Sequence, residues 1–311
     1  MEALHQGADG AHVSYKNVVI YVGFTLCLSN AAADSVLVIR KSISEVRLPL
    51  VANDKYGRSL PVLLPADISV LEDGHAISNF DVRPAQDNSL QVGILLDLSY
   101  STQANWRPMQ SAVMKFMEES VRPADQTLLL AFDTKVEVEK AVSHPEEVRA
   151  AISSVPAGGP TAFYDAVYHA CQNSMFKNGG VSARSALIVF SDGEDNLSLH
   201  NLNDSIAAAE SSGIAVYTIS IRKQKARKPA DEILQQLAVA TGGQAFVVRR
   251  EQDIQDTLKA ISEELRSFYL LYYRLSRQPE RREFHRIHIT PAQGAIHSLR
   301  YREGYYTEPS Q

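Results

Sequence analysis

The chain has 311 residues, of which 45% are hydrophobic and 22% are charged, and its formal net charge is -5. This length allows one large or two modest domains with a buried core, and the composition is that of an ordinary soluble globular protein. The negative charge argues against nucleic acid as a partner, because nucleic-acid binding usually needs a basic surface. One basic run, residues 222–228, is interpreted as a solvated loop because Pro229 follows it.

The N-terminal segment has the order of a secretory signal. Lys16 precedes an apolar run over residues 18–28, and small residues follow as far as Ala33. The run is shorter than the roughly 20 residues of a membrane-spanning helix. We therefore predict a signal peptide over residues 1–33 and export to the periplasm, the cell envelope or the medium. Two alternatives stay open: a buried first strand, and an uncleaved signal that would be the only membrane contact.

The cysteine count agrees with export. Cleavage near Ala33 would remove Cys27 and leave Cys171 alone, so that no intrachain disulfide could form. Cys171 lies among apolar residues of an expected helix, and we predict a buried, inert thiol there. No Cys and His pattern resembles a zinc site.

Short strands and turns follow the signal. Residues 46–51 and 67–71 read as strands, the second with period 2, and the polar turn at 72–74 ends it. No segment of helical periodicity interrupts them. We predict an N-terminal β module over residues 34–88, which ends in a linker at residues 84–88.

The pattern then changes to alternating strands and helices. Largely apolar runs, typical of strands buried on both faces of a sheet, occupy residues 91–96, 128–132, 185–190 and 214–221. Residues at helical spacing lie between them, as in 106–117 and 162–176. The alternation predicts a doubly wound, mostly parallel α/β domain over residues 89–266, with helices on both faces of the sheet.

The chain returns to strands after this region. Residues 268–273, 284–290 and 298–301 are rich in β-forming residues. Neither β-rich flank has a helix to cover its apolar face. We therefore predict that residues 267–311 pack with the N-terminal module as one small β-sandwich-like unit.

Polar side chains gather at the carboxyl edge of the expected sheet, where ligands bind in folds of this class. They are Asp97, Ser99 and Ser101 after the first strand, Thr161 after a Gly-Gly turn, and Asp192 after the third strand. Alternating residues of an extended segment point the same way, so the first three can form one wall of a site. We expect Asp97 at a solvent-facing strand end.

These five side chains offer two carboxylates and three hydroxyls. Such oxygen donors suit Mg²⁺, or Mn²⁺ or Ca²⁺, and the neutral hydroxyls leave the ion able to accept a partner's carboxylate. Local roles are the alternative: Ser101 or Thr102 could cap a helix, as could Thr161, and Asp192 could belong to a plain turn. Five such residues at one sheet edge are harder to explain by separate local roles.

The same residues resemble a known motif. Asp97-x-Ser99-x-Ser101, Thr161 and Ser191-Asp192-Gly193 resemble the metal-ion-dependent adhesion site (MIDAS) of the von Willebrand factor type A domain. Thr241-Gly242-Gly243 before a late strand is also usual in that family. The resemblance covers about residues 89–266 and implies a Rossmann-like fold. It also implies that the two serines ligate a metal directly, the two aspartates directly or through water, and the threonine according to conformational state.

The flanks carry a second resemblance. Residues 64–80, 268–273 and 302–306 are similar to exported bacterial proteins of the acidobacterial-type group with this domain. Together the two resemblances imply a secreted or envelope protein that binds an Asp or Glu of a protein partner through its metal, as in cell adhesion.

We interpret the protein as a binding module rather than an enzyme. A metal-dependent hydrolase is the alternative, and it would need a base near the ion. Glu194 and Asp195 are the nearby titratable residues, and a solvated loop accounts for both. The sequence contains no G-x-S-x-G, P-loop or H-E-x-x-H motif. A metal-independent structural scaffold of the envelope is the remaining alternative.

Overall fold

The computed structural model describes residues 45–85, 89–153, 155, 158–177, 184–221, 229–275, 280–292 and 296–307. The chain separates into two units, Met1–Lys41 and Ser42–Gln311. The predicted signal peptide and the basic run at residues 222–228 lie outside the described residues. Among those that are described, no helix is long and apolar enough to cross a membrane.

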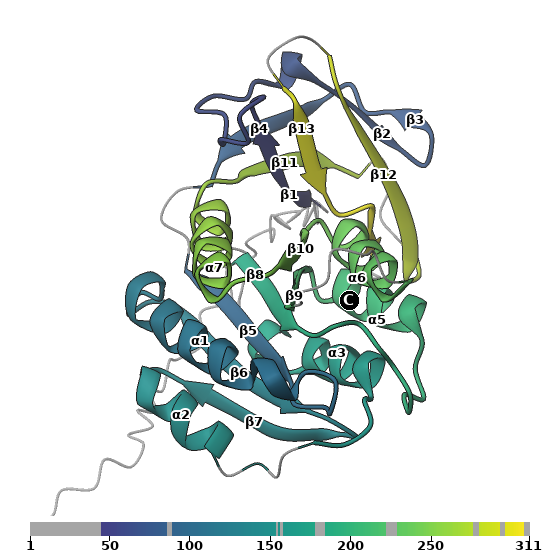
Figure 1. Cartoon of the computed structure of the whole chain (residues 1–311). Helices are drawn as coiled ribbons and strands as arrows, with labels where there is room; N and C mark the ends of the chain where they lie inside the picture. Colours follow the sequence, from purple (N-terminus) through teal and green to yellow (C-terminus); the bar gives the residue numbers. More distant parts are fainter. Residues whose placement is uncertain are drawn as a thin grey trace, which may run out of the picture. The chain divides into compact units, whose positions relative to one another are not determined.

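A six-stranded sheet forms the centre of the α/β region (Figure 1). Its order is β10-β9-β8-β5-β6-β7, and all neighbours are parallel except β6 and β7. The strands are β5 (Leu90–Asp97), β6 (Gln126–Phe132), β7 (Val136–Val142), β8 (Arg184–Phe190), β9 (Ile214–Ile221) and β10 (Ala245–Val248). The four apolar runs are the four central strands, β5, β6, β8 and β9. The predicted doubly wound, mostly parallel sheet is therefore confirmed.

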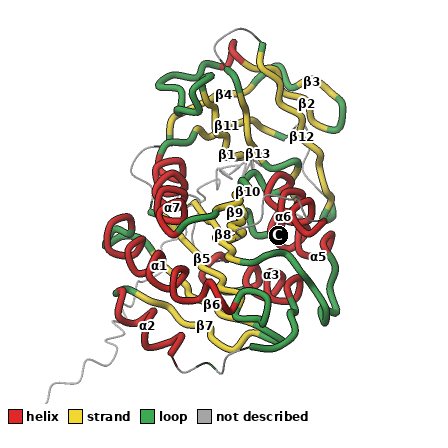
Figure 2. The backbone as a smooth tube through the Cα atoms, viewed as in Figure 1, coloured by secondary structure: helices red, strands yellow, loops and turns green. Residues whose placement is uncertain are grey.

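Helices cover both faces of this sheet, as Figure 2 shows. They are α1 (Trp106–Ser120), α2 (Pro145–Ser153), α3 (Phe163–Gln172), α4 (Ser174–Lys177), α5 (Leu202–Ser211), α6 (Pro229–Ala240) and α7 (Glu251–Arg266). Buried residues of α1, α2 and α7 share one core with Ile94 and Leu96, whereas those of α3 to α6 share the other with Leu95. Successive side chains of β5 thus enter opposite cores.

One of the helices expected from the sequence is interrupted in the structure. The helix expected over residues 162–176 is interrupted at Asn173, whose backbone is extended and whose side chain accepts a hydrogen bond from Met175 N (2.8 Å). A side chain that bonds the backbone locally competes with the helical ladder. Cys171 is buried as predicted, and burial raises the pKa of its thiol to about 12, which disfavours the reactive thiolate.

The two flanks form two antiparallel sheets, β13-β1-β11-β4 and β14-β12-β2-β3. The strands are β1 (Glu45–Asn53), β2 (Ile68–Glu72), β3 (His75–Ala76), β4 (Phe80–Pro84), β11 (Tyr269–Arg274), β12 (Glu283–Pro291), β13 (Ser298–Tyr301) and β14 (Gly304–Thr307). Each sheet combines N-terminal with C-terminal strands, and one core contains residues from both, among them Leu48, Leu271 and Ile289. The expectation that the flanks pack together is confirmed.

A junction of backbone and side-chain contacts joins the flanks to the α/β region. Thr241, just after α6, forms a β-bridge with Arg302. Glu264 of α7 forms an ion pair with Arg300 of β13 and accepts a hydrogen bond from the Tyr217 hydroxyl (2.6 Å). The domain boundaries at residues 33, 88 and 266 stay predictions.

Candidate functional site

Asp97 ends β5 at the carboxyl edge of the sheet. Its side chain is fully buried, so the expectation of a solvent-facing strand end was wrong. The chain folds back over the strand end, where Asp97 Oδ1 accepts a hydrogen bond from Ser99 N (2.9 Å) and Oδ2 accepts one from Ser191 Oγ (2.6 Å). Burial raises the pKa of Asp97 to about 6, and the negative charge of Asp192 adds to the increase. A nearby cation would lower this pKa.

The residues after Asp97 alternate in direction. The hydroxyls of Ser99 and Ser101 lie 3.2 Å apart, whereas Leu98 is buried in the core and Tyr100 is exposed. Neither Ser101 nor Thr102 caps a helix through its side chain, because the Thr102 hydroxyl donates to the carbonyl oxygens of Asp97 (2.7 Å) and Ser99 (3.1 Å). Thr102 closes the loop that places the two serines. Sequence reasoning missed this role, because a hydroxyl before a helix looks like an N-cap.

Thr161 lies in a second loop that contacts the first. Tyr100 N donates to the carbonyl oxygen of Gly159 (3.2 Å). Gly158 has φ +88°, and a Cβ there would lie 2.6 Å from the Tyr100 ring, so only glycine allows this approach. Thr161 is buried, and its carbonyl oxygen accepts hydrogen bonds from the backbone N–H groups of Asn196 (2.8 Å) and Leu197 (3.1 Å).

Asp192 lies in a third loop, directly after Ser191. The Ser191 hydroxyl donates to Asp97 and accepts from Gly193 N (3.0 Å), so it links the first loop to the third. Asp192 is partly buried, and its Oδ1 accepts a hydrogen bond from Glu194 N (3.3 Å). Gly193 has φ +77°, and a Cβ there would lie 2.8 Å from the Ala230 carbonyl oxygen at the start of α6. The turn is therefore fixed by its packing on α6.

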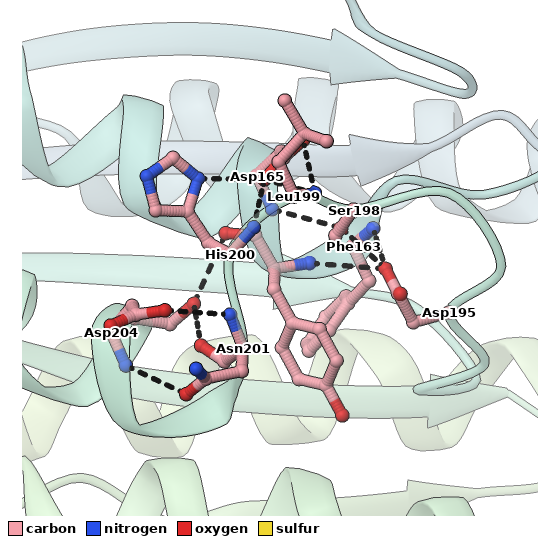
Figure 3. A network of polar contacts seen from close by, with 10 residues as sticks. Phe163, Asp165, Asp195, Ser198, Leu199, His200, Asn201 and Asp204 are labelled. Atoms are coloured by element: carbon pink, nitrogen blue, oxygen red, sulfur yellow. Dashed lines mark hydrogen bonds and ion pairs between the residues drawn. The ribbon is translucent and has the colours of Figure 1, made fainter.

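Asp195 caps α3 from outside the helix (Figure 3). Its Oδ1 accepts hydrogen bonds from Phe163 N (2.8 Å), Tyr164 N (3.4 Å) and Ser198 Oγ (2.5 Å). The local candidate for this role, Thr161, does not cap the helix, whose N-cap residue is Ala162 without a side-chain bond. A cap that comes from more than 30 residues away leaves no local sequence signal. Asp195 is thus a structural residue and not an available base.

The residues at this edge fit a hard divalent cation. The structure brings the three loops into contact, with Asp97, Ser99 and Ser101 on one of them, Thr161 on the second and Asp192 on the third. Nowhere in the described ranges do three or more His, Cys, Asp or Glu side chains form a group that could hold a metal. Any ion here would therefore depend on hydroxyls as well as on two carboxylates, a donor set that suits Mg²⁺ and leaves positions for water or a partner.

Comparison with protein families gives a match over most of the α/β region. The model of the von Willebrand factor type A domain matches residues 91–260, which is more than half of the chain. No curated protein sequence matches the chain significantly.

Comparison with solved structures gives matches of low sequence identity. Proximal thread matrix protein 1 from the mussel byssus, solved with a zinc-occupied MIDAS motif, is 18% identical, with a TM-score of 0.46 over 59% of this chain and 50% of that protein. BatB from Bacteroides thetaiotaomicron is 18% identical, with a TM-score of 0.45 over 57% of this chain and 98% of BatB. A von Willebrand factor type A protein from Catenulispora acidiphila is 11% identical, with a TM-score of 0.47 over 86% of this chain and 74% of that protein. The present chain thus spans half the length of the mussel protein.

Proposed function

The chain belongs to the von Willebrand factor type A domain family, and we propose that it is an exported module that binds an acidic side chain of a protein partner through a metal ion. Domains of this family are typically MIDAS-dependent binding modules that bind protein ligands and are usually not catalytic. The observation that carries the proposal is the fully buried Asp97 carboxylate, held by Ser99 and Ser191 beside two serine hydroxyls that lie 3.2 Å apart.

The proposed metal ligands are Asp97, Ser99, Ser101, Thr161 and Asp192. Mg²⁺ is the proposed ion, and Mn²⁺ or Ca²⁺ would use the same oxygen donors. When bound, the ion would supply an electrophilic position for a partner's carboxylate. The protein's own part is to hold the donors in place, through the bonds that Thr102 and Ser191 make to the first loop.

A binding role explains the titratable groups near the site better than hydrolysis does. Asp195 accepts three hydrogen bonds as a helix cap, so it is committed to structure. Glu194 lies exposed on the third loop, away from the enclosed position that a general base normally occupies. A metal-independent scaffold would bind no metal at this edge, so a metal titration distinguishes it from the proposed binding module.

The partner belongs to the protein's surroundings after export, so localisation is part of the same proposal. We propose that the chain belongs to the exported acidobacterial-type group of the family, because of the segments at residues 64–80, 268–273 and 302–306, which include β2, β3 and parts of β11 and β14. N-terminal sequencing of envelope or secreted material should begin near Asp34. Intact chain in the cytosol would contradict export.

The experiment is a calorimetric titration of Mn²⁺ and Mg²⁺ into the wild type and into Asp97→Asn. Asparagine keeps the shape of the buried side chain but removes its charge, so we expect metal binding to fall by at least about tenfold while the fold survives. The matched control is Glu194→Gln, which removes an acid of the third loop that is not a proposed ligand, and it should bind metal like the wild type. Thermal melts of all three proteins check folding. Equal metal affinity in the wild type and Asp97→Asn would refute the metal site.

A further inference from the structure

Three large apolar side chains are exposed on the loops of the candidate site. The exposed fractions are 66% for Tyr100, 50% for Leu197 and 94% for Leu199. Single exposed apolar residues are common on protein surfaces and need no explanation. Here, three such side chains lie on loops that contact one another at one sheet edge. We call these three residues, Tyr100, Leu197 and Leu199, the apolar rim.

Two members of the rim lie beside proposed metal ligands. Tyr100 is the residue between Ser99 and Ser101, and its ring lies against Gly158. Leu197 donates its backbone N–H to the carbonyl oxygen of Thr161 (3.1 Å). The two exposed side chains are therefore attached to backbone that contacts residues 158–161. Both side chains therefore start from backbone at the same sheet edge as the proposed ligands.

The third member, Leu199, is held in place by a polar network (Figure 3). The Asp165 carboxylate accepts hydrogen bonds from Leu199 N (3.0 Å), His200 N (2.8 Å) and His200 Nδ1 (2.7 Å), and Ser198 Oγ accepts one from Asp165 N (3.1 Å). The His200 ring also stacks on Tyr168, with ring centroids 3.9 Å apart.

This network fixes the backbone and leaves the Leu199 side chain exposed. A side chain presented by an ordered loop loses less conformational entropy on binding than one on a loop that must first become ordered. The arrangement therefore favours contact with a partner over an incidental exposure of leucine.

The charges around the rim define the chemistry of its partner. Residues 97–105, 158–162 and 191–201 contain no Lys or Arg. Side chains of these loops would therefore not attract a carboxylate, and the proposed metal would have to do so. The exposed large apolar side chains of these loops are those of the apolar rim, and burying them against a partner would supply affinity.

We propose that Tyr100, Leu197 and Leu199 bind a peptide segment of the partner in which an Asp or Glu is flanked by bulky apolar side chains. This inference rests on the proposed function, because the acidic residue would be the one that reaches the metal. It adds that the residues next to that acid decide which partner binds.

The test uses a random peptide library displayed on phage, selected on the immobilised full chain in Mg²⁺ and eluted with EDTA. Peptides enriched on the wild type should contain an Asp or Glu with Leu, Ile, Phe, Tyr or Trp close by. Selection on Leu197→Ser/Leu199→Ser should still enrich acidic peptides but without the apolar preference. A peptide selected on the wild type should bind this variant about tenfold to a hundredfold more weakly.

The matched control is Val239→Ser/Val247→Ser, which removes two exposed apolar side chains of α6 and β10. It should select the same peptides as the wild type. Metal titration of every variant should give the wild-type affinity, because the rim contributes no ligand. A change in metal affinity on loss of the two leucines would show that they support the metal loops and would overturn the proposal.

The remaining outcomes separate this inference from the proposed function. Acidic peptides without an apolar preference on the wild type would overturn the rim and leave the metal bridge intact. No enrichment in the EDTA eluate would overturn both. Self-association of the wild type in Mg²⁺, lost in the leucine double variant, would assign the rim to a second copy of this chain and overturn the peptide partner.

Discussion

Buried polar groups have different surroundings in the flanking sheets and in the loops of the α/β region. In the flanks, the hydroxyls of Tyr273 (2.8 Å) and Tyr305 both donate to Glu72, and the two hydroxyl oxygens lie 3.2 Å apart. Burial raises the pKa of both tyrosines, so they stay protonated as donors. At the sheet edge, Asp97 is buried near a second carboxylate, Asp192, on loops without any Lys or Arg.

This difference separates structure from function within the molecule. A single carboxylate that accepts hydrogen bonds from neutral hydroxyls stabilises a fold, whereas two carboxylates brought close together at a sheet edge are a candidate binding place for a cation. The flanks are therefore interpreted as a structural unit and the edge loops as the binding region. The four predictions below test that division.

The largest effect is expected from ending the chain after Arg266. This removes β11, the partner of β1 and β4, and β12, the partner of β2, so the N-terminal strands lose their sheets. Hydrogen exchange should show loss of protection throughout residues 45–84. Among the described strands, the six-stranded sheet receives none from the flanks, so its protection should persist. Unchanged protection of residues 45–84 would mean that the two flanks fold independently.

A second effect is expected at the junction, from Gly242→Ala. Gly242 has φ +81°, and a Cβ there would lie 2.8 Å from Arg302 N, so alanine is strained and also collides with backbone. The matched control is Gly74→Ala, at the same φ of +81° but with nothing within 4 Å. We expect a loss in unfolding free energy of about 1 kcal/mol for the control and about 3 kcal/mol for Gly242→Ala. Urea denaturation measures both losses. Equal losses would show that the backbone around Arg302 shifts to accommodate the Cβ at little cost in free energy.

The sequence predicted the fold wherever a periodic pattern matched its surroundings. Buried apolar runs identified the four central strands, and the uncovered flanks correctly implied a shared core. The edge strand β7 was missed because it is largely exposed and has no apolar run like those of the central strands, although its first residues alternate valine with glutamate. The break at Asn173 was missed because it depends on one side-chain bond. Neither feature changes the apolar periodicity on which the prediction of strands and helices depends.

The residues of the candidate site could be predicted from the sequence, but the hydrogen bonds that hold them in place could not. The spacing of Asp97, Ser99 and Ser101 pointed to one wall of a site, and the serine hydroxyls do lie together. The burial of Asp97 depends on Ser191, and the cap of α3 depends on Asp195, both from a loop far along the chain. Sequence spacing carries no information about such long-range contacts. The metal itself stays a prediction.

The third prediction concerns pH at the contact between α5 and the flanks. Burial raises the pKa of Glu210 from 4.5 to about 7, although the positive charge of Arg302 opposes the shift. As the pH rises from about 4.5 to about 7, the unfolded chain loses this proton while the folded chain keeps it, so the wild type loses stability. Glu210→Gln stays neutral, so its advantage in unfolding free energy should grow by about 2 kcal/mol between about pH 5 and about pH 8. Urea denaturation at the two pH values measures it, and a constant difference would contradict a raised pKa.

The smallest effect on stability is expected from removing a helix cap. The cap of α3 comes from a loop of the candidate site, whereas the cap of α5 does not. Asp195→Ala removes the distant cap of α3 and should lower the unfolding free energy by about 1 kcal/mol. The matched control is Asn201→Ala, which removes the local cap of α5, where the side chain accepts from Asn203 N and Asp204 N. We expect a similar loss for the control, because each change leaves helix N–H groups unpaired.

The two caps should differ in their effect on metal binding. Asp195 bonds Phe163 N, two residues after Thr161, and so holds the third loop against the second. Without it, Thr161 and Asp192 should be less well positioned, and we expect Mn²⁺ affinity to fall several-fold, whereas Asn201→Ala should bind like the wild type. Calorimetric titration of both variants makes the comparison. If both caps affected stability alone, Asp195 would be a helix cap like any other, and the edge loops would not depend on it to form the site.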